Sequence, residues 1–98
     1  MNIQQVDGAK AGKFFLKEQD KQLAEMIYTW AENGDMVIQH TEVDPSLKGK
    51  GVGFALVSAA VEQAQSKGFK LHANCPYAAA VLKKTKAFHD VMADSIDH

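Results

Sequence analysis

The sequence of 98 residues lacks several features that would assign it to a particular class of protein. Its single cysteine cannot form an internal disulfide, and its N-terminus lacks the basic and then apolar pattern of a signal peptide. No apolar run approaches the ~20 residues that a membrane-spanning helix needs. These absences predict a cytoplasmic protein that does not cross a membrane.

Neither charge nor metal-binding residues are concentrated in this chain. The formal net charge is -1, which argues against a nucleic-acid partner bound mainly through counterion release. No cluster of cysteine and histidine has the spacing of a zinc site, so we expect no metal. The length and the hydrophobic fraction of 46% predict a single domain, residues 1–98, with one modest core.

The two common phosphate-binding motifs are also absent. No GxxxxGK string is followed by serine or threonine, and no GxGxxG string lies within repeated parallel βαβ units. The segment Asp44–Gly53 nevertheless holds glycines at alternate positions, 49, 51 and 53, just before an apolar run. Glycine permits close approach of a ligand, and a helix start presents free amides and partial positive charge. The segment therefore predicts a phosphate-binding loop, and a glycine-rich turn with solvated lysines is the alternative.

Hydrophobic spacing predicts strands in the first half of the chain. We expect strands at Phe14–Leu16, Leu23–Ala31 and Met36–Val43, with a turn at residues 18–20 and a hairpin at residues 33–35. In the second of these strands the alternation puts four residues on one face: Ala24, Met26, Tyr28 and Trp30. This half is expected to be an antiparallel meander.

The second half changes to helical spacing. An amphipathic helix is predicted from Val52 with Gly68 as its stop, then a strand over Phe69–Asn74. A second helix should begin at Cys75-Pro76, and its inner face could hold Tyr77, Ala78, Val81, Leu82 and Thr85. The order β-β-β-α-β-α predicts an α/β (α+β) fold with a mixed, mostly antiparallel sheet and helices packed against it. The tail from Phe88 has no clear pattern.

These residues resemble the GCN5-related N-acetyltransferases. The string Val43-Asp44-Pro45, continued by Lys48 to Gly53, resembles their pyrophosphate loop, Q/R-x-x-G-x-G/A, with Lys48 in the first place. Asn74 with Ala78 resembles a later asparagine-x-x-x-alanine signature. Together with residues 40–43, the Cys-Pro-Tyr string at 75–77 is similar to a subgroup of very short, minimal acetyltransferase-like proteins.

The resemblance implies the minimal acyl-CoA N-acyltransferase fold with acetyl-CoA or coenzyme A as cofactor. In this family two strands splay apart and the pantetheine arm enters between them, here Met36–Val43 and Phe69–Asn74. The loop amides would hold the pyrophosphate, and the acceptor would be an amine of a small molecule or a protein. The implied cofactor-binding residues are Glu42, Val43, Lys48, Gly49, Lys50, Gly51, Val52, Gly53 and Asn74.

Two departures from the family direct attention to Cys75. Longer members often carry a tyrosine that is proposed to protonate the leaving thiolate, but Leu82 and its neighbours Val81 and Lys83 offer no hydroxyl. We also expect no counterpart of the N-terminal helices that usually form much of the acceptor pocket. Cys75 is predicted at a helix start, which favours a nucleophilic thiolate, and His40 on the neighbouring strand could be its base.

Alternatives remain open at this stage. Cys75 could be a small buried cap residue, and Glu42 could act as the base in a direct attack. The protein is therefore predicted to be an N-acetyltransferase, acting by direct attack or through Cys75, or else a non-catalytic acyl-CoA-binding module.

Overall fold

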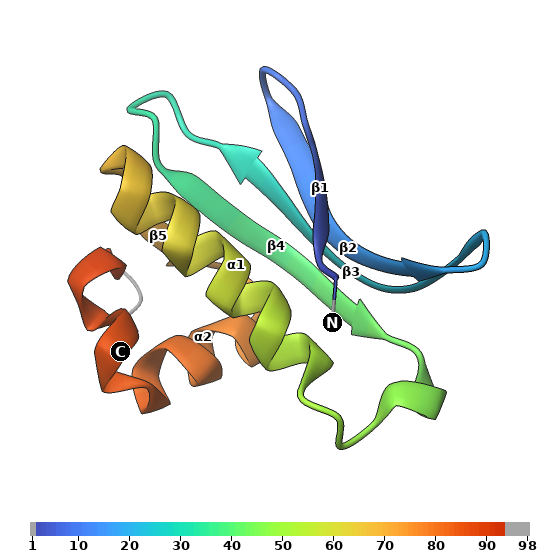
Figure 1. Ribbon diagram of the computed structural model, residues 1–98. Coiled ribbons are helices and arrows are strands. Elements are labelled where there is room, and N and C mark those ends of the chain that lie inside the picture. The colour runs from blue at the N-terminus through green and yellow to red at the C-terminus, as the bar shows by residue number, and fades with distance from the viewer. Residues whose placement is uncertain (1, 94–98) are drawn as a thin grey trace.

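Five strands and two α-helices form the part of the chain that the computed structural model describes, residues 2–93 (Figure 1). The strands are β1 (Gln4–Asp7), β2 (Ala11–Glu18), β3 (Lys21–Trp30), β4 (Met36–Val43) and β5 (Leu71–Ala73). The helices are α1 (Val52–Lys67) and α2 (Pro76–Lys84), with short 3-10 helices η1 (Pro45–Leu47) and η2 (Lys86–Val91). No helix within this range is both long and apolar enough to span a bilayer.

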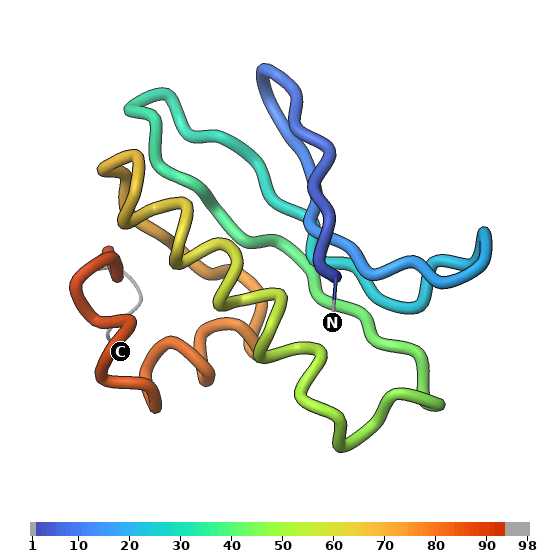
Figure 2. Tube along the Cα trace, in the orientation of Figure 1, coloured from blue at the N-terminus to red at the C-terminus, as the bar shows by residue number. Residues whose placement is uncertain are grey.

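The strands lie in one sheet in the order β1-β2-β3-β4-β5. The first four are antiparallel neighbours, and β5 is parallel to β4 because α1 carries the chain back across the sheet. Figure 1 shows α1 lying along the sheet and α2 beside it, and Figure 2 shows the chain path through both helices. The predicted mixed, mostly antiparallel sheet is confirmed.

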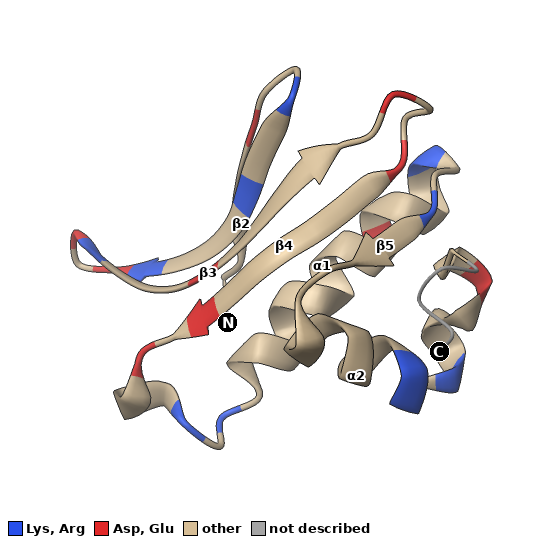
Figure 3. Ribbon diagram, turned by 180° about the vertical axis from the view of Figure 1, so that it is seen from behind, with Lys and Arg blue, Asp and Glu red and all other residues tan. Residues whose placement is uncertain are grey.

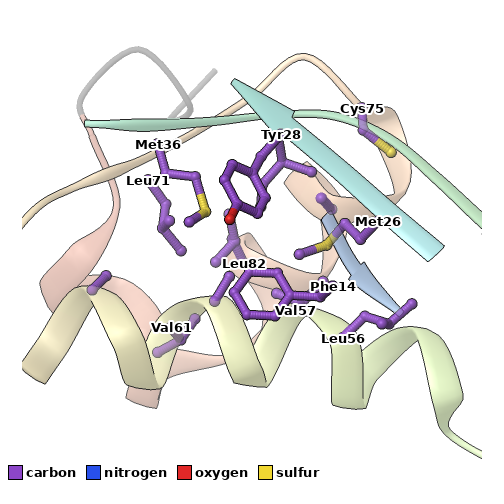
Figure 4. Packing of buried hydrophobic residues seen from close by; sticks show 14 of the residues in the cluster. Phe14, Met26, Tyr28, Met36, Leu56, Val57, Val61, Leu71, Cys75 and Leu82 are labelled. Atoms are coloured by element: carbon purple, nitrogen blue, oxygen red, sulfur yellow. The ribbon is translucent and has the colours of Figure 1, made fainter. Parts of the chain in front are cut away.

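One hydrophobic cluster joins the sheet to the helices. The alternation of β3 buries Ala24, Met26 and Tyr28, which meet Leu56 and Val57 of α1. Figure 4 shows Met26 and Tyr28 on the side of the sheet that faces Leu56 and Val57. The period-2 pattern of the strand and the apolar stripe of the helix therefore bury the same surface, as the sequence predicts.

Several predicted boundaries agree with the structure and others differ. Gly68 ends α1 with a φ of 82°, and Pro76 is the first residue of α2. The strand predicted over Phe69–Asn74 is shorter, Leu71–Ala73, because the amides of Asn74 and Cys75 both turn to the Ile38 carbonyl. Tyr77 was expected on the inner face of α2 but is 45% exposed.

The sequence pattern did not reveal β1. All four of its residues are exposed, so they show no apolar alternation. Side-chain hydrogen bonds attach this strand instead: the Tyr28 hydroxyl donates to Asp7 Oδ1 at 2.6 Å and accepts from Gln5 Nε2 at 2.8 Å. Trp30 Nε1 also donates to Asp7 Oδ1, at 2.8 Å. Burial and the bond to Asp7 raise the pKa of Tyr28 to about 12.

An extra residue in β4 changes which side chains face the helices. Tyr28 pairs with Ile38, but Ile27 pairs with His40, so Gln39 is the additional residue of a β-bulge. The Gln39 side chain accepts from Asn74 Nδ2 at 3.1 Å and donates to Thr29 Oγ1 at 3.0 Å. These two bonds hold the bulge between β3 and the end of β5.

The Tyr28 network generates a prediction about stability. Tyr28→Phe keeps the buried ring but removes the hydroxyl that joins β3 to β1. We expect the free energy of unfolding, measured by urea denaturation, to fall by about 1–2 kcal/mol. An unchanged midpoint would show that β1 is held by its backbone pairing alone.

Candidate functional site

The candidate site lies where β4 and β5 separate. The two strands pair from Met36 to Ile38, opposite Leu71 to Ala73. At Ile38 the pairing ends, since its carbonyl accepts from the amides of Asn74 at 2.9 Å and Cys75 at 3.3 Å. Among residues 2–93, no strand therefore pairs with the rest of β4, up to Val43, on that edge.

The bulge at Gln39 decides which residues of this free segment face the helices. Thr41 pairs with Met26 and Val43 with Ala24, both of them buried on the helix side of the sheet. His40 pairs with Ile27 and therefore projects from the opposite side, here called the outer face. Figure 3 views the sheet from that side, and no helix of the described residues crosses it.

This arrangement corrects the predicted partnership of Cys75 and His40. His40 is exposed on the outer face, and no hydrogen bond joins it to Cys75 within residues 2–93. Glu42 lies on the same outer face, opposite Glu25, and lines a separate hollow of about 280 Å³. The side chains of His40 and Glu42 are thus directed away from Cys75, because the bulge reverses the alternation of β4.

A cavity of about 460 Å³ lies between the free edge of β4, the loop after η1 and the start of α2. We call it the loop cavity; it is lined by Thr41, Val43, Leu47, Lys48, Gly49, Gly51, Val52, Gly53 and Tyr77. Its volume is within the range of ~300–1,000 Å³ that is typical of small-molecule sites. Five of the predicted loop residues and Val43 therefore share one wall with Thr41 and Tyr77.

The loop exposes backbone amides at the start of α1. The first intrahelical bond runs from the Ala55 amide to the Gly51 carbonyl, so the amides of Val52, Gly53 and Phe54 have no acceptor within the helix. Gly49 and Gly51 have φ angles of 79° and 75°, a region that side chains disfavour. Free amides together with the helix dipole suit an anion.

The two loop lysines differ in position. Lys48 lines the loop cavity, whereas Lys50 lines a different hollow together with Leu16 and Glu18. Figure 3 shows positive charge, in blue, along the segment that leads into α1. Only Lys48 is placed where its charge can act on a ligand in the loop cavity.

Cys75 is the N-cap residue of α2 and is 6% exposed. Its thiol donates to Thr41 Oγ1 at 3.5 Å, so it lies behind a residue that lines the loop cavity. Figure 4 places Cys75 at the margin of the core cluster. The cysteine is therefore next to the cavity and mostly shielded from solvent.

Opposing effects act on the ionisation of this thiol. Burial raises the pKa of Cys75, but the Thr41 hydroxyl and the amides of Ala78, Tyr77 and Thr41 lower it, and the net pKa is below its ordinary value. None of these amides makes a well-formed cap hydrogen bond with the sulfur, so they act mainly as oriented dipoles. These effects lower the pKa of Cys75 without a hydrogen bond to a basic side chain of residues 2–93.

Two residues at this site were not predicted from the sequence. Thr41 could not be predicted because regular alternation along β4 would put His40 on the helix side and Thr41 on the outer face. The bulge that reverses this has no sequence signal of its own. Helical spacing predicts Tyr77 on the inner face of α2. The one available signal is the glycine at position 53, which leaves room for the Tyr77 ring to approach α1. The described residues include no cluster of three or more histidine, cysteine, aspartate or glutamate side chains that could hold a metal ion.

Sequence comparison identifies one family. The sequence model described as GCN5-related N-acetyl-transferase matches residues 13–91. No curated protein sequence shows significant similarity to the chain.

Comparison with solved structures supports the same fold. A GCN5-like protein of Staphylococcus aureus, a proposed N-acetyltransferase, is 33% identical with a TM-score of 0.73, over 94% of this chain and 89% of the other. Ribosomal-protein-alanine N-acetyltransferase of Brucella melitensis biovar Abortus 2308 is 18% identical with a TM-score of 0.61, over 88% and 66%. An aminoglycoside acetyltransferase from an uncultured soil sample, bound to sisomicin, is 19% identical with a TM-score of 0.64, over 82% and 59%. The last two show the fold alone.

The environment of Cys75 predicts how its reactivity depends on pH. Thr41→Val removes the hydroxyl that donates to the thiolate, so the pKa of Cys75 should rise and less thiolate should exist at neutral pH. We expect alkylation by iodoacetamide at pH 7 to slow by about fivefold to tenfold, with little change at high pH. Since Cys75 is the only cysteine, mass spectrometry reports on this site alone.

Thr41→Ser is the matched control because it keeps the hydroxyl. It should alkylate with the pH profile of the wild type. If Thr41→Val also keeps that profile, the hydroxyl does not stabilise the thiolate.

Proposed function

The chain belongs to the GCN5-related N-acetyltransferase family, and we propose that it binds acetyl-CoA in the loop cavity. Acetyl-CoA is the acetyl donor that this family generally uses. In our proposal the pyrophosphate binds the free amides of Val52, Gly53 and Phe54, and Lys48 adds positive charge. The acceptor is an amine of a small molecule or of a protein.

The observation that carries this proposal is the continuity of one cavity. Its wall includes the glycine loop at one end and Thr41 and Val43 of the free β4 edge at the other. Since Asp44 donates its amide to Leu23 of β3, the alternate residues Val43 and Thr41 direct their backbone groups to the open edge. A pantetheine arm could bond to this edge as an additional strand would, while its diphosphate stays on the loop.

We further propose that acetyl transfer passes through Cys75. Its thiolate would attack the acetyl carbonyl carbon, and the bond to the CoA sulfur would break with CoA leaving as a thiolate. An uncharged amine would then attack the Cys75 thioester, releasing the Cys75 thiolate and a proton to solvent. One thiolate replaces another in the first step, so no strong general acid is needed at the position of the buried Leu82.

The second candidate is an acyl-CoA-binding module without turnover. It is favoured by one observation: within the described part of the chain, the residues that line the loop cavity include no carboxylate and no imidazole. Direct attack by an amine would have no evident base there. Cys75 itself would then be a buried cap residue whose polarity is satisfied by Thr41.

The two lysines allow a controlled test of the binding site. Lys48→Ala should weaken CoA binding a few-fold, because one charge is lost from a site that remains partly screened by solvent. Lys50→Ala is the matched control, and it should bind like the wild type. Isothermal titration calorimetry with CoA measures both, and equal losses would argue against the loop cavity as the phosphate site.

The covalent route predicts an acetyl adduct. Wild-type protein mixed with acetyl-CoA and quenched within milliseconds should carry an acetyl group on Cys75, and Cys75→Ala should carry none. Cys75→Ala should also lose at least about 100-fold in turnover, since a nucleophile is removed. Full turnover without Cys75 would exclude this route, and CoA binding with no turnover in either protein would support the binding module.

A further inference from the structure

The two tyrosines of the chain make different use of their hydroxyls. Tyr28 is fully buried, and its hydroxyl is bonded to Gln5 and Asp7. Tyr77, the second residue of α2, is 45% exposed, and its hydroxyl has no hydrogen-bond partner among residues 2–93. A large aromatic side chain with an unused donor therefore stands in the wall of the loop cavity.

The ring of Tyr77 lies against the backbone of Gly53. A Cβ atom added to Gly53 would lie 2.7 Å from Cζ and 2.8 Å from Cε2 of Tyr77, and closer still to the hydroxyl. The ring therefore rests on the bare Cα of Gly53. This glycine does not have the positive φ of Gly49 and Gly51, so its missing side chain provides room and not backbone freedom.

This contact brings the phenol to the first turn of α1. Gly53 contributes one of the three amides that lack an acceptor in the helix, and its neighbours are Val52 and Phe54. An anion on these amides would lie beside the Tyr77 hydroxyl. Burial and the negative charge of Cys75 raise the pKa of Tyr77, so its phenol stays a donor at neutral pH.

From this geometry we infer that the Tyr77 hydroxyl donates a hydrogen bond to the diphosphate of the ligand. The inference rests on the proposed function and adds a positioning residue to it. Tyr77 would complete from α2 an anion site that the α1 amides and Lys48 begin. Because Cys75 is two residues before Tyr77, ligand binding would also fix the start of α2, which holds the thiol.

Tyr77→Phe tests this inference because it keeps the ring on Gly53 and removes only the donor. We expect the affinity for CoA to fall by about tenfold or more, as is usual for a hydrogen bond to a charged group. Tyr28→Phe is the matched control: it should leave CoA affinity unchanged. Calorimetry at fixed ionic strength measures all three proteins, and thermal unfolding checks that Tyr77→Phe is as stable as the wild type.

A double-mutant cycle tests the role of Gly53. Gly53→Ala should push the phenol away and weaken CoA binding. The same substitution should weaken CoA binding less in the Tyr77→Phe background than in the wild type, because the donor is already lost. If the losses of CoA-binding free energy from the two single substitutions simply add in the double variant, Gly53 does not act by positioning the Tyr77 hydroxyl.

Titration with a second ligand shows which part of CoA is in contact with Tyr77. ADP carries a diphosphate without the pantetheine arm, so its affinity should fall by the same factor in Tyr77→Phe. If Tyr77→Phe loses affinity for CoA but not for ADP, the hydroxyl does not contact the diphosphate. If wild type and Tyr77→Phe bind CoA equally, the inference about Tyr77 is overturned and the proposed function is not affected. No binding of CoA to the wild type would overturn the proposed function and this inference together.

Discussion

The β-bulge at Gln39 is the constraint on which the site depends. One extra residue in β4 moves Thr41 and Val43 to the helix side of the sheet and His40 to the outer face. The same residue accepts from Asn74, at the point where β5 ends and α2 begins. The separation of the strands and the position of α2 are therefore linked through a single irregularity in the ladder.

The glycines around the start of α1 serve two physical purposes. Gly49 and Gly51 adopt positive φ angles, which allow the chain to turn from η1 into the helix. Gly53 has a conformation that any residue could adopt, but its Cα is covered by the Tyr77 ring. A motif that reads as one glycine pattern in the sequence thus combines a backbone requirement with a packing requirement.

The surroundings of Cys75 lower the pKa of its thiol without a hydrogen bond to any histidine of residues 2–93. The Thr41 hydroxyl and amides at the start of α2 lower the pKa of Cys75 despite its burial. Such dipoles are part of the fold and need no titratable partner, so they work in a domain with few elements. The same burial shields the thiol from solvent, and Thr41, to which the thiol donates, lines the loop cavity.

The sequence by itself determined four of the five strands, both α-helices and the glycine-rich turn before α1, because these follow from local patterns. Alternation in residues 24–30, helical spacing after Gly51 and the stops at Gly68 and Pro76 each depend on a few neighbouring residues. The exposed strand β1 could not be predicted, since the side chains that bond to it, Tyr28 and Trp30, are more than twenty residues away from Asp7. Only the tertiary structure decided which residues meet Cys75: Thr41 and not His40, because a bulge depends on pairing between strands and not on local sequence.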